Sequence, residues 1–209
     1  MNGFTDAKVE KYIYGLLPKR DAVLSEMEKL AGEREIPIIG PAVARLLFLL
    51  ARASGAKRIF EMGSAIGYSA IWLARAAGQD AEVYYTEGDP ANEKRAKEFA
   101  SRAGVAGRIR FLLGDALELI DRIAGDFDMI FIDVDKVQYP QALAKAVPRV
   151  RSGGLLITDN TLWSAKVVTK AEDEDTRAIQ EFNTQVYAVP NLFPVLIPLR
   201  DGVTVCLKH

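Results

Sequence analysis

The sequence predicts an α/β protein built on a mostly parallel sheet, and two observations lead to that prediction. Five short apolar stretches alternate with helical segments, and they lie at 57–62, 82–87, 108–115, 126–133 and 153–160. Strands that alternate with helices over short connections form parallel sheets between helix layers. The last two apolar stretches, "FPVLIPL" and "VTVCLK", are separated only by Arg200, Asp201 and Gly202, and so short a link joins antiparallel strands. We therefore expect one reversed strand at the end of an otherwise parallel sheet.

Capping residues mark the helices between these strands. The first strand leads through "GSAIGYS" into the helical "AIWLARAAG", which Gly78 is expected to end. In "DPANEKRAKEFASRAG", Asp89 can cap a helix and Pro90 fits its first turn. The inward stripe of that helix is predicted to be Ala96, Phe99, Ala100 and Ala103. Residues 1–50 are expected to be a helical region within a single domain of 209 residues.

Composition narrows the classes of partner. The chain has 27 Lys and Arg against 28 Asp and Glu, without a basic block, so we expect no nucleic-acid partner. The most apolar segment, "AVARLLFLLARA", is interrupted by Arg45 and Arg52 and is too short for a membrane span, so it is predicted to be a buried helix. The single cysteine, Cys206, is predicted to be a small buried apolar residue. The N-terminus lacks the pattern of a secretory signal, and a cytoplasmic protein is expected.

Acidic residues end all five predicted parallel strands: Glu61, Glu87, Asp115, Asp133 and Asp159. Ligands of open α/β sheets bind beyond the carboxyl ends of the strands. Some of these acids could simply cap helices or lie in solvent, but five at one sheet edge indicate a site. The acidic run in "TKAEDEDTRA" (169–178) is instead predicted to be a solvated loop leading into a helix.

The first three strand ends indicate a ligand that contains adenosine. In "EMGSAIGYS", glycines at 63 and 67 allow the backbone to approach a ligand before a helix N-terminus. Glu87 could accept hydrogen bonds from both hydroxyls of a ribose, and Asp115 with Ala116 could flank an adenine. The turn is not the G-x-G-x-x-G fingerprint, and these residues do not identify the ligand further.

The last two parallel strands indicate a divalent cation. Adjacent strands lie roughly 5 Å apart, so Asp133, Asp159 and Asn160 are expected to converge. Ligands that are all oxygen favour Mg²⁺, the most probable ion here, with Mn²⁺ or Ca²⁺ as alternatives. Lys136 follows Asp133 closely, and a lysine beside a metal in a dry pocket can serve as a general base.

Five motifs in order, "EMGSAIGYSA", "YYTEGDP", "FIDVDKVQYP", "GGLLITDNTLWSAKVV" and "LRDGVTVCLK", resemble the metal-dependent O-methyltransferases of the catechol and caffeoyl-CoA type. The resemblance implies S-adenosylmethionine as the methyl donor and a Rossmann-like, class I methyltransferase fold. That fold has seven strands, with the last inserted antiparallel beside the fifth and helices on both faces. It also implies a homodimer, to which residues 1–50 contribute while they cover the cofactor.

The resemblance further assigns a role to each site residue. The cofactor-binding residues would be Ile39 (through its backbone), Glu61, Gly63, Ser64, Ser69, Glu87, Asp115, Ala116 and Asp135. The metal ligands would be Asp133, Asp159 and Asn160, the catalytic base Lys136, and Trp163 the wall of the pocket for a small aromatic acceptor.

Two other functions stay open at this point. One is a protein that binds S-adenosylmethionine without catalysis, which the presence of Asp133, Lys136, Asp159 and Asn160 disfavours. The other is a nicotinamide-dependent oxidoreductase, which the absent G-x-G-x-x-G and the reversed last strand disfavour.

Overall fold

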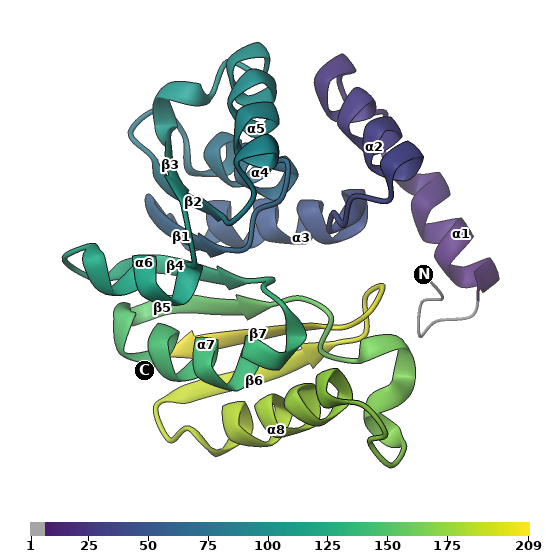
Figure 1. The fold of residues 1–209 in the computed structure, drawn as a ribbon, viewed down its shortest axis with the longest axis vertical. Coiled ribbons are helices and arrows are strands. Elements are labelled where there is room, and N and C mark those ends of the chain that lie inside the picture. Colours follow the sequence, from purple (N-terminus) through teal and green to yellow (C-terminus); the bar gives the residue numbers. More distant parts are fainter. Residues whose placement is uncertain (1–6) are drawn as a thin grey trace.

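The computed structural model describes residues 7–209 and contains one seven-stranded sheet in the order β3-β2-β1-β4-β5-β7-β6. The strand β7 is antiparallel to both of its neighbours, and the pairs among β1 to β5 are parallel. The predicted fold class is therefore confirmed, including the reversed strand beside the fifth (Figure 1). The strands are β1 Arg58–Met62, β2 Glu82–Glu87, β3 Ile109–Leu113, β4 Phe127–Ile132, β5 Val150–Thr158, β6 Leu192–Ile197 and β7 Val203–Lys208.

The register brings the strand ends into one row. Met62 pairs with Ile132, and Ile132 pairs with Thr158. The ladder continues one step further, because the Asp133 amide donates to the Met62 carbonyl at 2.8 Å and the Asp159 amide donates to the Ile132 carbonyl at 3.2 Å. The backbones at Asp133 and Asp159 are thus held side by side by the sheet itself.

Helices cover both faces of the sheet, and two apolar cores lie between the layers (Figure 1). On one face lie α2 Ala22–Arg34, α3 Gly40–Ala53, α4 Tyr68–Ala77 and α5 Pro90–Arg102. On the other lie α6 Ala116–Arg122, α7 Tyr139–Ala146 and α8 Glu174–Ala188. The helix α1 Ala7–Leu16 precedes α2 at the edge of the molecule, and the short 3-10 turns are η1 Ala106–Arg108, η2 Lys136–Gln138, η3 Val147–Arg149 and η4 Trp163–Val168.

The predicted helix signals are confirmed with one difference. The Asp89 side chain accepts from the Ala91 amide, and Gly78 follows α4 with φ 89°. The inward stripe of α5 is buried at Ala96, Phe99 and Ala100, but Ala103 is only partly buried because it lies at the helix end. Cys206 is buried, as predicted.

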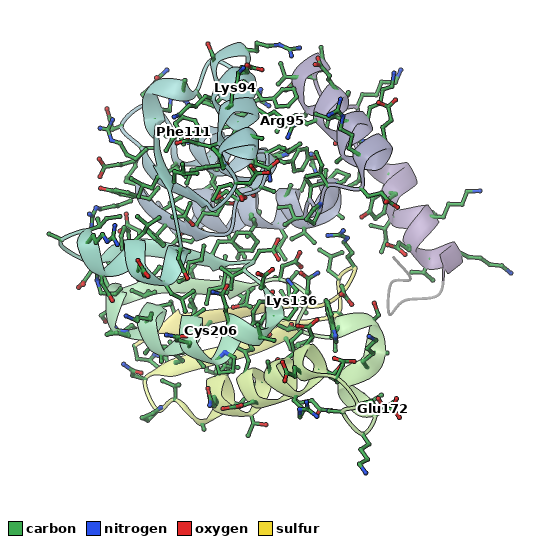
Figure 2. All side chains as sticks on the ribbon, viewed as in Figure 1. Lys94, Arg95, Phe111, Lys136, Glu172 and Cys206 are labelled. Carbon is green, nitrogen blue, oxygen red and sulfur yellow. The ribbon has the colours of Figure 1, made fainter. Side chains whose placement is uncertain are left out.

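The apolar segment before β1 forms α3, which is amphipathic and not buried on every side. Its inner residues include Val43, Ala44 and Leu47, whereas Leu49 is 62% exposed. No helix in the described part of the chain is long and apolar enough to cross a membrane. The acidic run before α8 is largely exposed, and Figure 2 shows Glu172 at the periphery.

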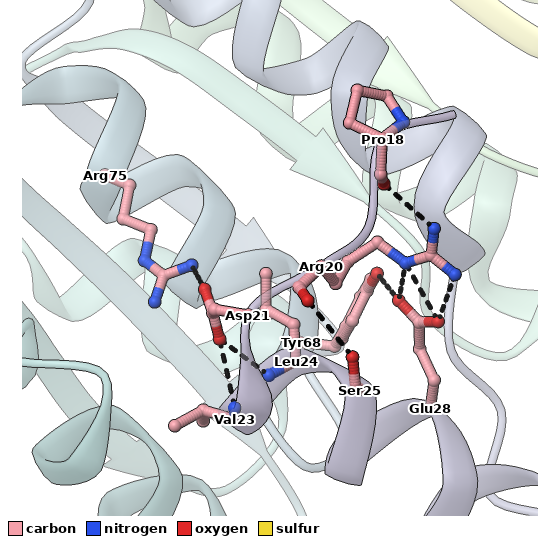
Figure 3. A network of polar contacts seen from close by, with 9 residues as sticks. All are labelled: Pro18, Arg20, Asp21, Val23, Leu24, Ser25, Glu28, Tyr68 and Arg75. Carbon is pink, nitrogen blue, oxygen red and sulfur yellow. Dashed lines mark hydrogen bonds and ion pairs between the residues drawn. The ribbon is translucent and has the colours of Figure 1, made fainter. Parts of the chain in front are cut away.

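Polar contacts fasten α2 to α4 (Figure 3). Asp21 caps α2 by accepting from the Val23 and Leu24 amides, and it pairs with Arg75 at 2.6 Å. Further along α2, the Glu28 carboxylate accepts from the Tyr68 hydroxyl at 2.7 Å. Because Tyr68 opens α4 directly after the β1 turn, this hydrogen bond ties the N-terminal helices to the carboxyl edge of the sheet.

Candidate active site

A cavity of about 1190 Å³ opens at the carboxyl edge of the sheet, where the turns after β1 to β5 meet the β6–β7 turn. This volume exceeds what one small ligand needs and suits two adjacent ligands. The predicted residues that line it are Ile39, Gly63, Ser64, Ser69, Glu87, Asp115, Ala116, Asp133, Asp135, Lys136, Asp159, Asn160 and Trp163. The structure thus brings together every predicted site residue except Glu61.

Gly63 allows two turns to approach closely. Its φ is 82°, and a Cβ there would lie 2.4 Å from the carbonyl oxygen of Asp133. Any side chain would therefore push the β1 turn away from the β4 turn. The Gly63 amide is held by the Thr86 hydroxyl at 3.2 Å, which fixes the turn against β2.

Glu61 lies beneath this turn and does not line the cavity. Its side chain is fully buried, the Ser64 hydroxyl donates to its Oε2 at 2.6 Å, and its Oε1 has no partner among residues 7–209. Burial raises the pKa of Glu61 to about 7, against the lowering by the Ser64 and Ser69 hydroxyls. Glu61 is therefore placed to orient Ser64, and its predicted direct contact with a ligand stays a prediction.

Glu87 and Asp115 line the cavity and also stabilise their own turns. The Oε1 atom of Glu87 accepts from the Asp89 amide at 2.9 Å, and Oδ1 of Asp115 accepts from the Leu117 amide at 2.7 Å to cap α6. Capping and ligand binding are compatible here, because each carboxylate retains its second oxygen for another donor.

Asp159 is the most isolated carboxylate of the site. Both of its oxygens are buried and without a hydrogen-bond partner in the described chain. Burial raises the pKa of Asp159 to about 7, the negative charge of Asp133 adds to the rise, and the Arg200 guanidinium opposes it. A buried carboxylate with two unfilled acceptors calls for a cation or a proton.

The oxygen atoms around Asp159 suit a hard divalent cation. Asp133 follows the neighbouring strand, and Asn160, which is buried with φ 56°, uses its amide nitrogen towards Asp201 at 3.5 Å. Residues 7–209 contain no cluster of three His, Cys, Asp or Glu side chains able to hold a metal. The predicted ligands Asp133, Asp159 and Asn160 comprise two carboxylates and an amide, a donor set whose chemistry would suit Mg²⁺ better than zinc.

Lys136 lies near the middle of the view in Figure 2, and its side chain is 13% exposed. Its ammonium donates to Oδ1 of Asp133 at 3.0 Å, to the Tyr139 hydroxyl at 2.8 Å and to the Val134 carbonyl at 3.3 Å. The Tyr139 hydroxyl in turn donates to the Asp159 carbonyl at 3.0 Å. Lys136 Nζ also lies 5.9 Å from the centre of the Trp163 ring.

Among the lining residues that the sequence analysis did not predict, two carry contacts relevant to the site. Tyr68 follows the β1 turn and links the cavity to α2, and Arg200 comes from the β6–β7 turn, which the sequence indicates only as a short connection. The arginine has φ 54° and lies 3.7 Å from Asp159. A charged residue in a turn that favours glycine is the one signal that could have pointed to Arg200.

The fold is an open α/β sheet with its cavity at the carboxyl ends of the strands, where proteins of this class bind their ligands. The sequence model of the O-methyltransferase family matches residues 19–209. The chain belongs to this family, and the predicted family and enzyme class are confirmed.

Known relatives are similar over most of their length. A catechol O-methyltransferase of Niastella koreensis is 32% identical over 195 residues, covering 90% of this chain and 88% of the relative. The rice protein tricin synthase 1 is 32% identical over 181 residues, covering 79% and 72%.

Solved structures share the fold. TomG of Streptomyces achromogenes, an O-methyltransferase of tomaymycin synthesis in complex with S-adenosylmethionine, has a TM-score of 0.88 at 28% identity over 97% of this chain and 96% of its own. An O-methyltransferase of Bacillus cereus in complex with S-adenosylhomocysteine has a TM-score of 0.87 at 26% identity, with 97% of each chain covered.

Proposed function

We propose that this protein transfers a methyl group from S-adenosylmethionine to one hydroxyl of a small aromatic vicinal diol, such as a catechol or a hydroxycinnamoyl compound, with a divalent cation at the site. The observation that carries the proposal is the pairing of two unlike regions in one cavity. One region has turns and acids suited to a nucleoside, and the other has the isolated Asp159 beside Asp133 and Lys136.

The cofactor is assigned to the region of β1, β2 and β3. The free oxygen of Glu87 can accept from ribose hydroxyls, while Asp115 and Ala116 flank the place for an adenine. Ser64, Ser69, Asp135 and the Ile39 backbone would surround the rest of the cofactor, with Glu61 acting through Ser64. The complexes of TomG with S-adenosylmethionine and of the B. cereus enzyme with S-adenosylhomocysteine support the choice of cofactor.

The cation and the acceptor are assigned to the region of β4 and β5. Asp133, Asp159 and Asn160 would hold the ion, which would favour the ionised form of an acceptor hydroxyl. We assign to Lys136, once it has lost its own proton, the acceptance of the hydroxyl proton, and to Trp163, which lines the cavity, the packing against the aromatic ring. In the present arrangement the Lys136 ammonium uses three acceptors, so it can also hold an oxyanion by its charge. Orientation of the two reactants in one cavity supplies the rest of the acceleration.

Transfer of a labelled methyl group tests the proposal. The purified chain is incubated with S-adenosylmethionine labelled in its methyl group and a panel of catechols and hydroxycinnamoyl thioesters, with Mg²⁺ or with EDTA. We expect a labelled monomethyl ether with Mg²⁺ and none with EDTA. Cofactor binding by calorimetry without transfer to any vicinal diol would favour the alternative of a binding protein without this chemistry.

Residues 1–50 are proposed to cover the cofactor within the single domain and to contribute to a homodimer in the cytoplasm. Two apolar surfaces support the dimer: Val9, Tyr12 and Leu16 on α1, and Phe193, Val195 and Leu207 on the sheet face of β6 and β7. Ile13 and Leu17, in the same segment, are partly buried and contribute less. Because most soluble oligomers are closed, we expect a twofold dimer, and light scattering that finds only the 23.0 kDa species at micromolar concentration would contradict it.

A further inference from the structure

Each carboxylate proposed to hold the cation already faces a cationic side chain. Asp133 pairs with Lys136 at 3.0 Å, and Asp159 has Arg200 Nη1 at 3.7 Å from its Oδ2. The proposed transfer gives Lys136 a role but uses Arg200 in no step. A divalent ion that binds both carboxylates therefore meets positive charge beside each of them.

The position of Arg200 is fixed by backbone contacts on both sides of it. The turn closes where the Gly202 amide donates to the Leu199 carbonyl at 2.9 Å. It is fastened to the loop after β5, because the Leu162 amide donates to the Asp201 carbonyl at 2.9 Å and the Thr161 amide donates to the Gly202 carbonyl at 3.0 Å. These two hydrogen bonds join the loop after β5 to the turn that carries Arg200, which lies at the yellow hairpin end in Figure 1.

The turn itself gives no reason for an arginine at this position. The φ of Arg200 is 54°, which lies in the left-handed region. Glycine adopts this region without strain, whereas a residue with a long side chain does not. The arginine side chain is nevertheless drawn inward, with only 12% exposed beside the 1% of Asp159. A charge held this deeply interacts strongly with its neighbours, because little water screens it.

The guanidinium of Arg200 offsets the negative charge of Asp159 but does not donate a hydrogen bond to either carboxylate oxygen. At 3.7 Å the pair is an ion pair, and neither oxygen of Asp159 has a hydrogen-bond partner in residues 7–209. The carboxylate lone pairs thus stay open to a metal ion, while its charge is already compensated. An incoming cation gains the carboxylate but meets the repulsion of the guanidinium.

We propose that Arg200 is an internal counter-cation that competes with the divalent ion for Asp159 and thereby weakens metal binding. The inference rests on the proposed metal site. It assigns Arg200 the role of offsetting the negative charge of Asp159 when no ion is bound. On metal binding, Asp159 then exchanges its interaction with Arg200 for one with the divalent ion, and the bound ion can be released again.

Calorimetric titration of the full chain with Mn²⁺ alone, without cofactor or acceptor, tests this role. Arg200→Gln removes the charge, Arg200→Lys keeps it, and Arg122→Gln removes an exposed arginine that pairs with Glu118 on α6. We expect Arg200→Gln to bind Mn²⁺ at least about tenfold more tightly than the unmodified chain. Arg200→Lys should lie close to the unmodified chain, and Arg122→Gln should match it.

Thermal unfolding in EDTA gives a second readout that does not depend on turnover. Arg200→Gln should unfold at a lower temperature because Asp159 loses its counter-charge, and saturating Mn²⁺ should raise its unfolding temperature more than that of the unmodified chain. If Arg200→Gln does not fold, Arg200→Gly serves instead, since glycine suits this backbone.

The outcomes separate the inference from the proposed function. Equal Mn²⁺ affinity of the unmodified chain and Arg200→Gln overturns the role of Arg200 and leaves the metal site intact. Absence of Mn²⁺ binding by every variant overturns the metal site and this inference together. Weaker binding in Arg200→Gln would mean that the arginine supports the site, which also contradicts the competition.

Discussion

The two regions of the cavity compensate their carboxylates in different ways. Around β1 to β3, neutral groups donate hydrogen bonds to the carboxylates: the Ser64 hydroxyl to Glu61, and the Leu117 amide to Asp115. Around β4 and β5, cationic side chains offset the charge of the carboxylates: Lys136 that of Asp133, and Arg200 that of Asp159.

This difference indicates which ligands each region can exchange. Acids held by local neutral donors keep their place whether or not a ligand is bound, and they suit the hydroxyls of a neutral ribose. Acids held by cations form a charged network whose partners can be replaced by another cation. Substitutions in the two regions should therefore affect different quantities, with turnover lost in one and cofactor affinity in the other.

The largest effect is expected from Asp159→Ala. The variant should lose turnover by roughly a thousandfold or more, because stabilisation of the transition-state charge by a metal is worth several kcal/mol. Its affinity for S-adenosylmethionine should be retained, as should that of Asp121→Ala, an exposed acid on α6 that pairs with Lys145. Methyl-transfer rates and calorimetry measure the two quantities, and full activity in metal-free buffer would contradict the metal assignment.

The second-largest effect is expected from Lys136→Ala, which should lower kcat by the ~10²–10⁴-fold typical of a lost general base. Cofactor affinity should barely change. Lys136→Arg should not restore kcat, since a guanidinium cannot accept the proton, whereas raising the pH should partly rescue the alanine variant.

Near-full activity of Lys136→Arg would instead assign a purely electrostatic role to the lysine. The three acceptors around its ammonium make this a real alternative. Lys145→Ala, on the neighbouring α7, controls for the loss of a positive charge.

Glu87→Ala should act on the other region. Charge-assisted hydrogen bonds contribute ~1.5–3 kcal/mol each, so loss of the free Glu87 oxygen should weaken S-adenosylmethionine binding at least about tenfold. The fold and the Mn²⁺ affinity should change little, and Glu98→Ala, an exposed acid on α5, should leave both affinities unchanged. An unchanged cofactor affinity by calorimetry would place the adenosine elsewhere.

The smallest effect concerns pH and stability. Burial raises the pKa of Glu61 from 4.5 to about 7 in the folded chain, so the folded state holds this proton more tightly than the unfolded state. Its contribution to the free energy of unfolding is present below pH 4.5 and is lost as the pH rises towards about 7. Asp159, with its pKa raised to about 7, acts in the same direction.

We therefore expect the metal-free chain to unfold at a lower temperature at pH 8 than at pH 5.5, and Glu61→Gln to reduce that difference. Unfolding followed by circular dichroism in EDTA measures it. An unchanged pH dependence in Glu61→Gln would show that Glu61 does not titrate as its burial implies.

Much of this architecture could be predicted from local signals in the sequence. The strands, the Asp89 cap and the Gly78 helix end depend on neighbours within a few residues, and the structure confirms them. The common edge of the acids also follows from the sequence, because parallel strands end at the same side of a sheet. Gly63 shows what local signals do not predict. Its close approach to the Asp133 carbonyl requires two turns that are distant in the sequence to meet in space.

Tertiary structure alone decided which acids reach the cavity and what faces them. Glu61 ends its strand like the others, yet its side chain lies under the β1 turn, because that turn folds back over it with Ser64 as its partner. Arg200 reaches Asp159 only because β7 lies beside β5 and brings the hairpin turn to the loop after β5. The sequence determined where charged residues end the strands, whereas the pairing of distant strands determined their partners, because side-chain interactions depend on distance in space.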